Sequence, residues 1–275
     1  MDILKVVGLE KSYINPDTKD HFKAVDGISF EIKAKQIYGI LGPNGAGKSS
    51  TVRILSTLSN LSDGSAHIAG QNVTKSPTEV RLLTGYVAQS TGVDAWATGK
   101  ENLLLQAQLE RVPRKKINKR VDNLLEWVGL SSVSRKLVKT YSGGMKRRLE
   151  IAMGLVHEPK VLFLDEPSTG LDPESRRKLW NDLKYLQKQK KITVLLTTHY
   201  LEEAEEHADR VGIMHQGRLR ADGDGGALPA HHRQLGDRAA LARRQRQAPR
   251  LRGHDALPVR PRVRRDDQPG RRLQG

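Results

Sequence analysis

Residues 36–50 read QIYGILGPNGAGKSS, an apolar segment followed directly by a glycine-rich loop. The apolar residues at 36–41 predict a short buried strand, and TVRIL at 51–55 predicts the first turns of a helix. A loop of the form G-x-x-x-x-G-K-S between a strand and a helix is typical of a phosphate-binding loop, or P-loop. The sequence therefore predicts a nucleotide-binding α/β fold built around this segment.

The loop carries several groups that can hold a polyphosphate. Gly42, Gly45 and Gly47 let backbone N–H groups close around phosphate oxygens, because glycine has no Cβ to hold them apart. Lys48 is placed to reach the β and γ phosphates, and the hydroxyl of Ser49 is placed to bind Mg²⁺. We expect the phosphates to lie against the whole loop, which consists of Gly42, Pro43, Asn44, Gly45, Ala46, Gly47, Lys48, Ser49 and Ser50.

A second chemical motif is VLFLDEP at 161–167, which predicts a buried strand that ends in two carboxylates. Side chains alternate along a strand, so Asp165 and Glu166 are expected to point to different places. Asp165 can then hold Mg²⁺ through water, while Glu166 accepts a proton from, or orients, an attacking water. Solvated charges at a strand end are the alternative, and the nearby P-loop favours the catalytic interpretation.

A second anion-binding pattern is YSGGMKRRL at 141–149, where a serine and two glycines precede the opening of a helix. A helix N-terminus offers free backbone N–H groups and a partial positive charge to an anion. Ser142, Gly143 and Gly144 therefore form a candidate phosphate cradle. One chain with two such cradles requires an explanation.

The apolar segments up to about residue 223 alternate with helical patterns, which predicts a sheet flanked by helices. Between Gln89 and Tyr141 the pattern changes to helices alone, KENLLLQAQLERV and INKRVDNLLEWVGL, and Gly129 is expected to end the second of these. We therefore expect a helical subdomain, at about 90–158, inserted into the α/β body. The expected strands are ILKVVGL, ISFEI, QIYGIL, GYVAQ, VLFLD and TVLLTT.

The composition limits the classes of protein to which the chain can belong. Of its 275 residues 37% are hydrophobic, which is enough for a core, but the longest apolar runs, VLFL and ITVLL, are too short to cross a membrane. Cysteine is absent, and the first residues alternate as a strand does, without the pattern of a signal peptide. We expect a cytosolic, disulfide-free protein whose membrane role, if any, depends on a partner.

The net charge of +16 is concentrated at the C-terminal end. Residues 224–275 hold thirteen arginines and five aspartates, and they contain no Lys, Glu, Ile, Phe, Trp or Tyr. Such a segment cannot bury enough apolar area to fold, so we expect a disordered tail. Two interpretations stay open: an Arg-rich tail that contacts RNA or acidic lipid headgroups, or a non-native end from a shifted reading frame, since these residues have GC-rich codons.

The motifs together resemble the nucleotide-binding subunit of ATP-binding cassette (ABC) transporters over residues 3–223. The resemblance rests on Gly42–Ser49, YSGGM at 141–145, VLFLDEP, STGLD at 168–172 and TTH at 197–199, in this order. YSGGMKRRLEIA and TTHYLEEAEEHADRVGIM are most similar to multidrug and daunorubicin-type exporter ATPases. The fold implied is a P-loop NTPase core with an antiparallel β subdomain and an inserted α-helical subdomain.

The resemblance assigns further roles to residues of this chain. His199 would contact the γ-phosphate, Gln89 would link Mg²⁺ and the attacking water to the helical subdomain, and Tyr13 would stack on adenine. In the family two cassettes stack head to tail, so Ser142, Gly143 and Gly144 would bind ATP held by the other copy. Asp172 would lie at the seam between the copies, although Asp172 and Pro173 also form an ordinary helix start.

We therefore expect an ATP- and Mg²⁺-binding ATPase that powers a separately encoded membrane-spanning permease, an exporter, from the cytoplasmic face of the cell membrane. The head-to-tail partner would be a second copy of the chain or a related cassette. One alternative is a soluble ABC-type ATPase that acts on ribosomes or nucleic acid. Another is a nucleotide-binding regulator that does not turn over. The chain has neither two cassettes nor a long heptad insertion, which argues against nucleic acid as a partner.

Overall fold

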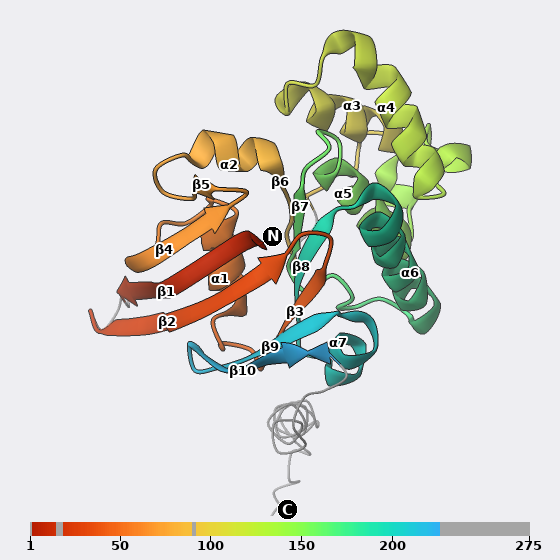
Figure 1. The fold of residues 1–275 in the computed structure, drawn as a ribbon. Coiled ribbons are helices and arrows are strands. Elements are labelled where there is room, and N and C mark those ends of the chain that lie inside the picture. The colour runs from red at the N-terminus through yellow and green to blue at the C-terminus, as the bar shows by residue number, and fades with distance from the viewer. Residues whose placement is uncertain (1, 15–18, 90–91, 226–275) are drawn as a thin grey trace, which may run out of the picture.

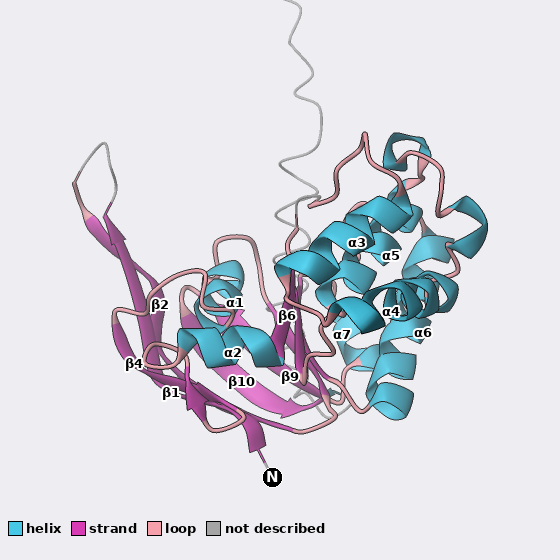
Figure 2. Cartoon of the chain, turned by 90° about the horizontal axis from the view of Figure 1, so that it is seen from above, coloured by secondary structure: helices cyan, strands magenta, loops and turns pink. Residues whose placement is uncertain are grey.

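The computed structural model describes residues 2–14, 19–89 and 92–225 of the chain. These residues form two β-sheets and a group of helices, which lie side by side in Figure 1. Figure 2 shows the helices between residues 99 and 190 gathered on one side of the molecule, away from the sheet that residues 2–14 and 21–33 help to form. This arrangement confirms the expected α/β fold with an antiparallel β subdomain and an inserted helical subdomain.

The larger sheet has the strand order β10-β9-β3-β8-β7-β6. All its pairs are parallel except the antiparallel pair of β9 and β10. The apolar segments correctly predicted β3, β6, β7 and β8, whereas β9 and β10 were not expected, because β10 is a polar edge strand with an exposed end. The strands are β3 (Ile37–Leu41), β6 (Thr84–Val87), β7 (Val161–Leu164), β8 (Thr193–Thr198), β9 (Arg210–His215) and β10 (Arg218–Asp224).

The central strands are apolar throughout because their alternate side chains enter two different cores. Tyr38, Phe163 and Leu195 lie in a core shared with the smaller sheet. The adjacent residues Ile37 and Leu162 lie in a second core, together with buried side chains of α6 and α7. A strand covered on both faces has no solvated side, so polar alternation is lost.

The smaller sheet is antiparallel, in the order β2-β1-β4-β5. The segments ILKVVGL and ISFEI correctly predicted its two long strands, β1 (Asp2–Ile14) and β2 (His21–Lys33). The strands β4 (Asp63–Ile68) and β5 (Gln71–Asn72) were not predicted, because both are short and rich in polar residues. These segments become strands because they pair with a neighbouring strand. For example, β4 pairs with β1 through a ladder that includes Leu4 and Ile68.

The helices surround the larger sheet or belong to the helical subdomain. They are α1 (Lys48–Leu55), α2 (Pro77–Leu83), α3 (Gly99–Leu109), α4 (Arg114–Trp127), α5 (Gly143–Gly154), α6 (Pro173–Lys190) and α7 (Leu201–His207), with 3₁₀ turns at Ser131–Val133 and Val138–Thr140. In the described part of the chain, none of them has the length and apolar character needed to cross a membrane.

The helical subdomain has a core of its own, formed by buried residues between Leu103 and Val156. Gly129 ends α4 as predicted: its φ is +65°, in the left-handed region, and its N–H donates to the carbonyl of Glu126. The N–H of Leu130 donates to the carbonyl of Leu125, and both leucine side chains lie in the subdomain core. The helix end is thereby fixed by backbone bonds and by packing.

The described chain continues two residues past the boundary expected at residue 223. Asp224 is the last residue of β10, and the N–H of Gly225 donates to the carbonyl of Asp209 at 3.1 Å. The remainder of the tail for which we expected disorder, residues 226–275, lies outside the described residues. The expectation for that segment therefore stays a prediction.

The packing of α6 against the larger sheet predicts a large effect of one leucine. Leu183 is fully buried, so Leu183→Ala leaves a cavity and should lower the free energy of unfolding by about 2–5 kcal/mol. Leu82 on α2 is 56% exposed, and the matched change Leu82→Ala should stay within about 0.5 kcal/mol of wild type. Urea denaturation of the three proteins measures this, and equal effects of the two changes would contradict the assignment of α6 to the core.

Candidate functional site

Four segments with polar side chains meet at one edge of the larger sheet. The parallel register pairs Leu41 with Thr198, Leu164 with Leu196, and Val87 with Leu164, so the carboxyl ends of β3, β8, β7 and β6 lie next to one another. The P-loop follows β3, while the other three strands lead to His199, to Asp165 and Glu166, and to Gln89. The sheet thus brings together chemical groups that lie far apart in the sequence.

The P-loop forms the wall of a cleft of about 230 Å³. Gly47 precedes α1 with φ +100°, a conformation that residues with a side chain rarely adopt, and Lys48 begins the helix. A Cβ on Gly47 would also collide with the carbonyl oxygen of Ala24, and one on Gly42 with that of Met214. The residues that line the cleft are Asn44, Gly45, Ala46, Gly47, Lys48, Ser49, Ser50, Gln89 and Glu166.

The amine of Lys48 lies at the bottom of this cleft, and the residue is only 4% exposed. Its Nζ donates to the carbonyl oxygens of Gly42 at 2.8 Å and Pro43 at 3.1 Å. It also lies 3.3 Å from Oε1 of Glu166. A buried ammonium needs such compensation, because removing its water without a partner is strongly unfavourable.

Glu166 is surrounded by donors and by positive charge. Oε2 lies 3.3 Å from Nδ1 of His199 and accepts hydrogen bonds from Gln89 at 3.3 Å and Thr169 at 3.2 Å. The hydrogen bond from His199 and the charge of Lys48 lower the pKa of Glu166 to about 2, against the opposing effect of burial. The carboxylate is therefore ionised throughout the physiological pH range.

Asp165 faces a different set of partners. Its Oδ1 accepts hydrogen bonds from the hydroxyl of Ser49 at 3.0 Å and from that of Thr197 at 2.6 Å. Thr197, in turn, accepts a bond from the backbone N–H of Glu166 at 2.9 Å. Thr197 and Thr169 lie within the quoted motifs TTH and STGLD, but the sequence assigned them no role, because their hydrogen-bond partners are brought to them only by the fold.

The other predicted anion cradle lies at the start of α5 and does not line the cleft. Ser142 caps this helix, since its hydroxyl accepts a bond from the N–H of Met145 at 3.2 Å. Ser142 and Gly143 are exposed, whereas Gly144 is buried against Ser175. Within one chain this cradle is therefore open and separate from the P-loop cleft.

Two further predicted residues also lie outside the cleft. Asp172 caps α6 by accepting bonds from the backbone N–H and the hydroxyl of Ser175, at 2.9 and 2.6 Å, as its position before Pro173 suggests. Tyr13 lies near the end of β1, where its ring stacks on that of Phe22 with centroids 5.7 Å apart. Nζ of Lys11 lies 5.0 Å from the Tyr13 ring centroid.

Comparison with known proteins assigns the chain to a family. A family model described as "ABC transporter" matches residues 25–169, which include the P-loop, the start of α5 and the carboxylates after β7. The chain belongs to the ABC transporter family. The resemblance inferred from the motifs is thereby confirmed.

Individual members of the ABC transporter family are similar in sequence to this chain. The chain is 45% identical over 206 residues to the daunorubicin/doxorubicin resistance ATP-binding protein DrrA of Streptomyces peucetius, over 75% of this chain and 62% of that protein. It is 41% identical over 227 residues to the daunorubicin resistance ATP-binding protein DrrA3 of Streptomyces coeruleorubidus, over 82% and 70%. The chain thus spans about two thirds of the length of these relatives.

A solved ABC cassette has the same fold. The structure of CbiO1 from Clostridium perfringens, described as part of the ABC transporter complex CbiONQ, superposes with a TM-score of 0.73 at 29% sequence identity. The match covers 91% of this chain and 97% of that one. The fold of the ABC cassette therefore accounts for nearly the whole of the described chain.

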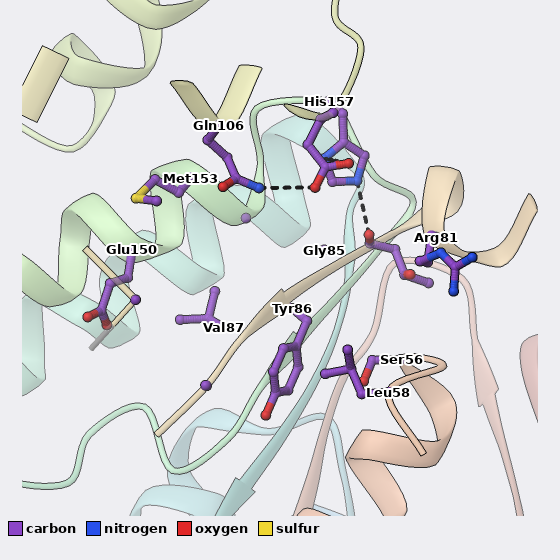
Figure 3. Close-up of a pocket in the computed structure, with 15 residues that line it drawn as sticks. Ser56, Leu58, Arg81, Gly85, Tyr86, Val87, Gln106, Glu150, Met153 and His157 are labelled. Atoms are coloured by element: carbon purple, nitrogen blue, oxygen red, sulfur yellow. Dashed lines mark hydrogen bonds and ion pairs between the residues drawn. The ribbon is translucent and has the colours of Figure 1, made fainter. Parts of the chain in front are cut away.

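A second cavity, of about 380 Å³, lies between the helical subdomain and β6 of the ABC cassette. Figure 3 shows Gln106 of α3 and Met153 of α5 on one side of β6, and Ser56 and Leu58, after α1, on the other. His157 contacts the carbonyl oxygen of Thr84 at 2.9 Å, which fixes the chain after α5 to the start of β6. The cavity thus borders both the helical subdomain and the strand that leads to Gln89.

The lowered pKa of Glu166 predicts a pH-dependent difference in stability. A folded-state pKa of about 2, below the ordinary 4.5, means that the carboxylate stabilises the fold fully above pH 4.5 and loses this effect as the pH falls toward 2. At neutral pH Glu166→Gln leaves Lys48 without its ion partner and should lower the free energy of unfolding by about 3 kcal/mol. Near pH 2 the two proteins should be equally stable.

Urea denaturation of both proteins at a series of pH values measures this difference. Glu126→Gln, on the exposed side of α4, is a matched control whose stability should follow that of wild type throughout. A difference between wild type and Glu166→Gln that stays constant from pH 7 to pH 2 would show that Glu166 and Lys48 do not interact in this way.

Proposed function

We propose that the chain is an ATP-binding and ATP-hydrolysing subunit that powers a separate, membrane-embedded exporter subunit. The observation that carries this proposal is that Lys48 and His199 both contact Glu166, which lines the cleft beside the P-loop. The relatives are named as drug-resistance ATP-binding proteins, which supports the choice of an exporter.

The P-loop would hold the phosphates of ATP. Its backbone N–H groups and the N-terminus of α1 supply donors and a partial positive charge, and Lys48 supplies a full charge. In the structure this lysine pairs with Glu166. A phosphate that enters the cleft would take over the lysine and so relieve Glu166 of its ion partner.

Release from Lys48 would prepare Glu166 to accept a proton. A carboxylate with a pKa of about 2 is a weak base, and a general base works best when its pKa lies near the operating pH. Loss of the lysine and gain of a nearby phosphate both raise the pKa of a carboxylate. Glu166 would then orient and deprotonate the attacking water, while His199 turns from Glu166 to the γ-phosphate.

The residues at the edge of the cleft also fit Mg²⁺. Mg²⁺ prefers oxygen donors and binds through one or two carboxylates together with phosphates and water. The hydroxyl of Ser49 and the carboxylate of Asp165 already lie 3.0 Å apart, and the Gln89 amide lies beside them on the cleft wall. These residues would hold the ion, which when bound neutralises charge on the β and γ phosphates.

Tyr13 would stack on the adenine ring. The Tyr13–Phe22 pair offers an aromatic surface at the end of the hairpin of β1 and β2, and Phe22 is 53% exposed. A π-face of this kind binds a planar base without reading which purine it is.

A second copy of the chain, or a related cassette, would complete the site. Ser142 and Gly143 are exposed at a helix start away from their own cleft. Together with the backbone of Gly144 they would bind the γ-phosphate of ATP held by Lys48 of the partner. Asp172 would lie at the seam. ATP would favour the closed dimer because only that state supplies contacts from both copies, and hydrolysis would remove them.

The membrane-spanning permease would dock on the helical subdomain. The cavity of Figure 3 is a suitable docking place, because a segment seated there would contact both the helical subdomain and β6. The strand β6 ends at Val87, two residues before Gln89. Through this partner the chain would act at the cytoplasmic face of the cell membrane. The names of the relatives favour this function over the alternative of a soluble ATPase acting on ribosomes or nucleic acid.

The role of Glu166 predicts that binding and turnover can be separated. Glu166→Gln should abolish ATP hydrolysis, retain ATP binding and accumulate a closed dimer, because the P-loop is unchanged and only proton acceptance is lost. Phosphate release and size-exclusion chromatography with ATP measure the two effects. Glu126→Gln should hydrolyse ATP like wild type, and hydrolysis by Glu166→Gln at the wild-type rate would refute the assignment.

The shared site predicts rescue when two inactive chains are mixed. In a heterodimer of Lys48→Ala and Ser142→Arg, one composite site has an intact Lys48 and an intact Ser142, and the other site carries both changes. Mixed samples should therefore bind ATP and dimerise better than either variant alone. Mixtures that behave as the average of the two separate variants would count against sites shared between copies.

A further inference from the structure

Arg147 lies on α5, and its guanidinium contacts the backbone on both sides of Glu166. Nε donates to the carbonyl oxygen of Pro167 at 3.1 Å, and Nη2 donates to that of Asp165 at 3.3 Å. Nη1 donates to the carbonyl oxygen of Ala88 at 2.7 Å, in the residue before Gln89. One side chain of α5 thus holds the two segments that carry Glu166 and Gln89.

We infer that Arg147 is a positioning residue for ATP hydrolysis, which holds Glu166 and Gln89 in the arrangement that the reaction needs. This inference rests on the proposed ATPase function. Arg147 lies outside the set of residues lining the P-loop cleft, so it acts through the backbone of its neighbours and not on the nucleotide.

The backbone of Glu166 needs this support. Its φ is +45°, in the left-handed region that a residue with a side chain adopts only at a cost in free energy. Such a conformation persists when the surrounding bonds leave no alternative. Here the N–H of Glu166 donates to Thr197, while Arg147 binds the carbonyls of the residues before and after it.

An arginine is suited to this task because its planar fork presents donors in several fixed directions. The three carbonyl groups come from two different strand ends, and a lysine, with one compact ammonium, cannot reach all three in the same geometry. The charge is balanced locally, since Nη1 also lies 2.8 Å from Oε2 of Glu150 on the same helix. Both residues of this pair are 7% exposed.

The position of Arg147 also connects the helix to the reaction. α5 begins at the cap Ser142, and Arg147 lies in its second turn. Any displacement of this helix therefore acts on the backbone that carries Glu166 and Gln89. The same helix that offers its N-terminus to a partner's nucleotide would thereby set the geometry of hydrolysis in its own chain.

Arg147→Lys tests the inference through the separate kinetic constants for ATP hydrolysis. The charge is kept but the fork is lost, so kcat should fall by about 10- to 100-fold, as a small misplacement of reacting groups does. KM for ATP should change less than about threefold, because the P-loop and Lys48 are untouched. Arg120→Lys is the matched control, since Arg120 also binds a carbonyl, that of Val156, and a carboxylate, that of Glu158, in the helical subdomain.

A second variant covers the case in which Arg147→Lys does not fold. The double change Arg147→Met with Glu150→Leu removes both members of the buried pair, and replacement of such a pair by apolar residues is often tolerated. It should unfold at a temperature near that of wild type and should still gain thermal stability from ATP, but with the same loss of kcat.

Each outcome separates this inference from the function on which it rests. Wild type that does not hydrolyse ATP would overturn both. Active wild type with unchanged kcat in Arg147→Lys or in the double variant would overturn the role of Arg147 alone. A rise in KM with kcat preserved would also overturn it, because the phosphate site and not the arrangement of Glu166 would then have changed.

Discussion

The buried ammonium of Lys48 is the constraint on which the site depends. A charge at 4% exposure must be compensated, and the chain compensates it with two loop carbonyls and the carboxylate of Glu166. Together with the hydrogen bond from His199, the same contact holds Glu166 at a pKa of about 2, where it is a poor base. An anion that replaces Glu166 at the lysine therefore does two things at once: it fills the cleft and it changes the chemistry of the carboxylate.

The surrounding fold confines the replacement of Glu166 by an anion at Lys48 to a few side chains. Two strands pack closely against the P-loop. A carbonyl group of β2 leaves no room for a side chain on Gly47, and a carbonyl group of β9 leaves none on Gly42. The helical subdomain has a core of its own, but Ile151 of α5 and Leu155, which follows this helix, lie in the core of the larger sheet. The polar contacts of His157 with β6 and of Arg147 with the chain after β7 add to this packing, so α5 joins the subdomain to the strands that carry the site.

Local sequence was informative wherever one short segment contained both an element and its chemistry. The buried strands β3, β7 and β8 are apolar because both faces are covered, and each is followed directly by its polar residues, so the P-loop, Asp165 with Glu166, and His199 could all be located. Strands β4, β5 and β10 could not, because pairing with a neighbour, and not their own composition, makes them strands. Thr197 and Arg147 were missed for a related reason, since their partners are brought to them only by the fold. The motifs did place Ser142 and Asp172 at helix starts, and both residues cap their helices away from the cleft of their own chain.

The packing around the P-loop glycines has a consequence for which substitutions accumulate in a related protein that has lost ATP hydrolysis. Gly42 and Gly47 are required by the approach of backbone from β9 and β2, whether or not a nucleotide is ever bound. Glu166 also compensates the buried charge of Lys48, whereas His199 is required only where its chemistry is used. In a lineage that lost hydrolysis but kept the folded protein, selection would go on removing replacements of the two glycines while it ceased to act on His199. The glycine pattern alone therefore follows from the fold, and the state of the imidazole records whether hydrolysis is still under selection.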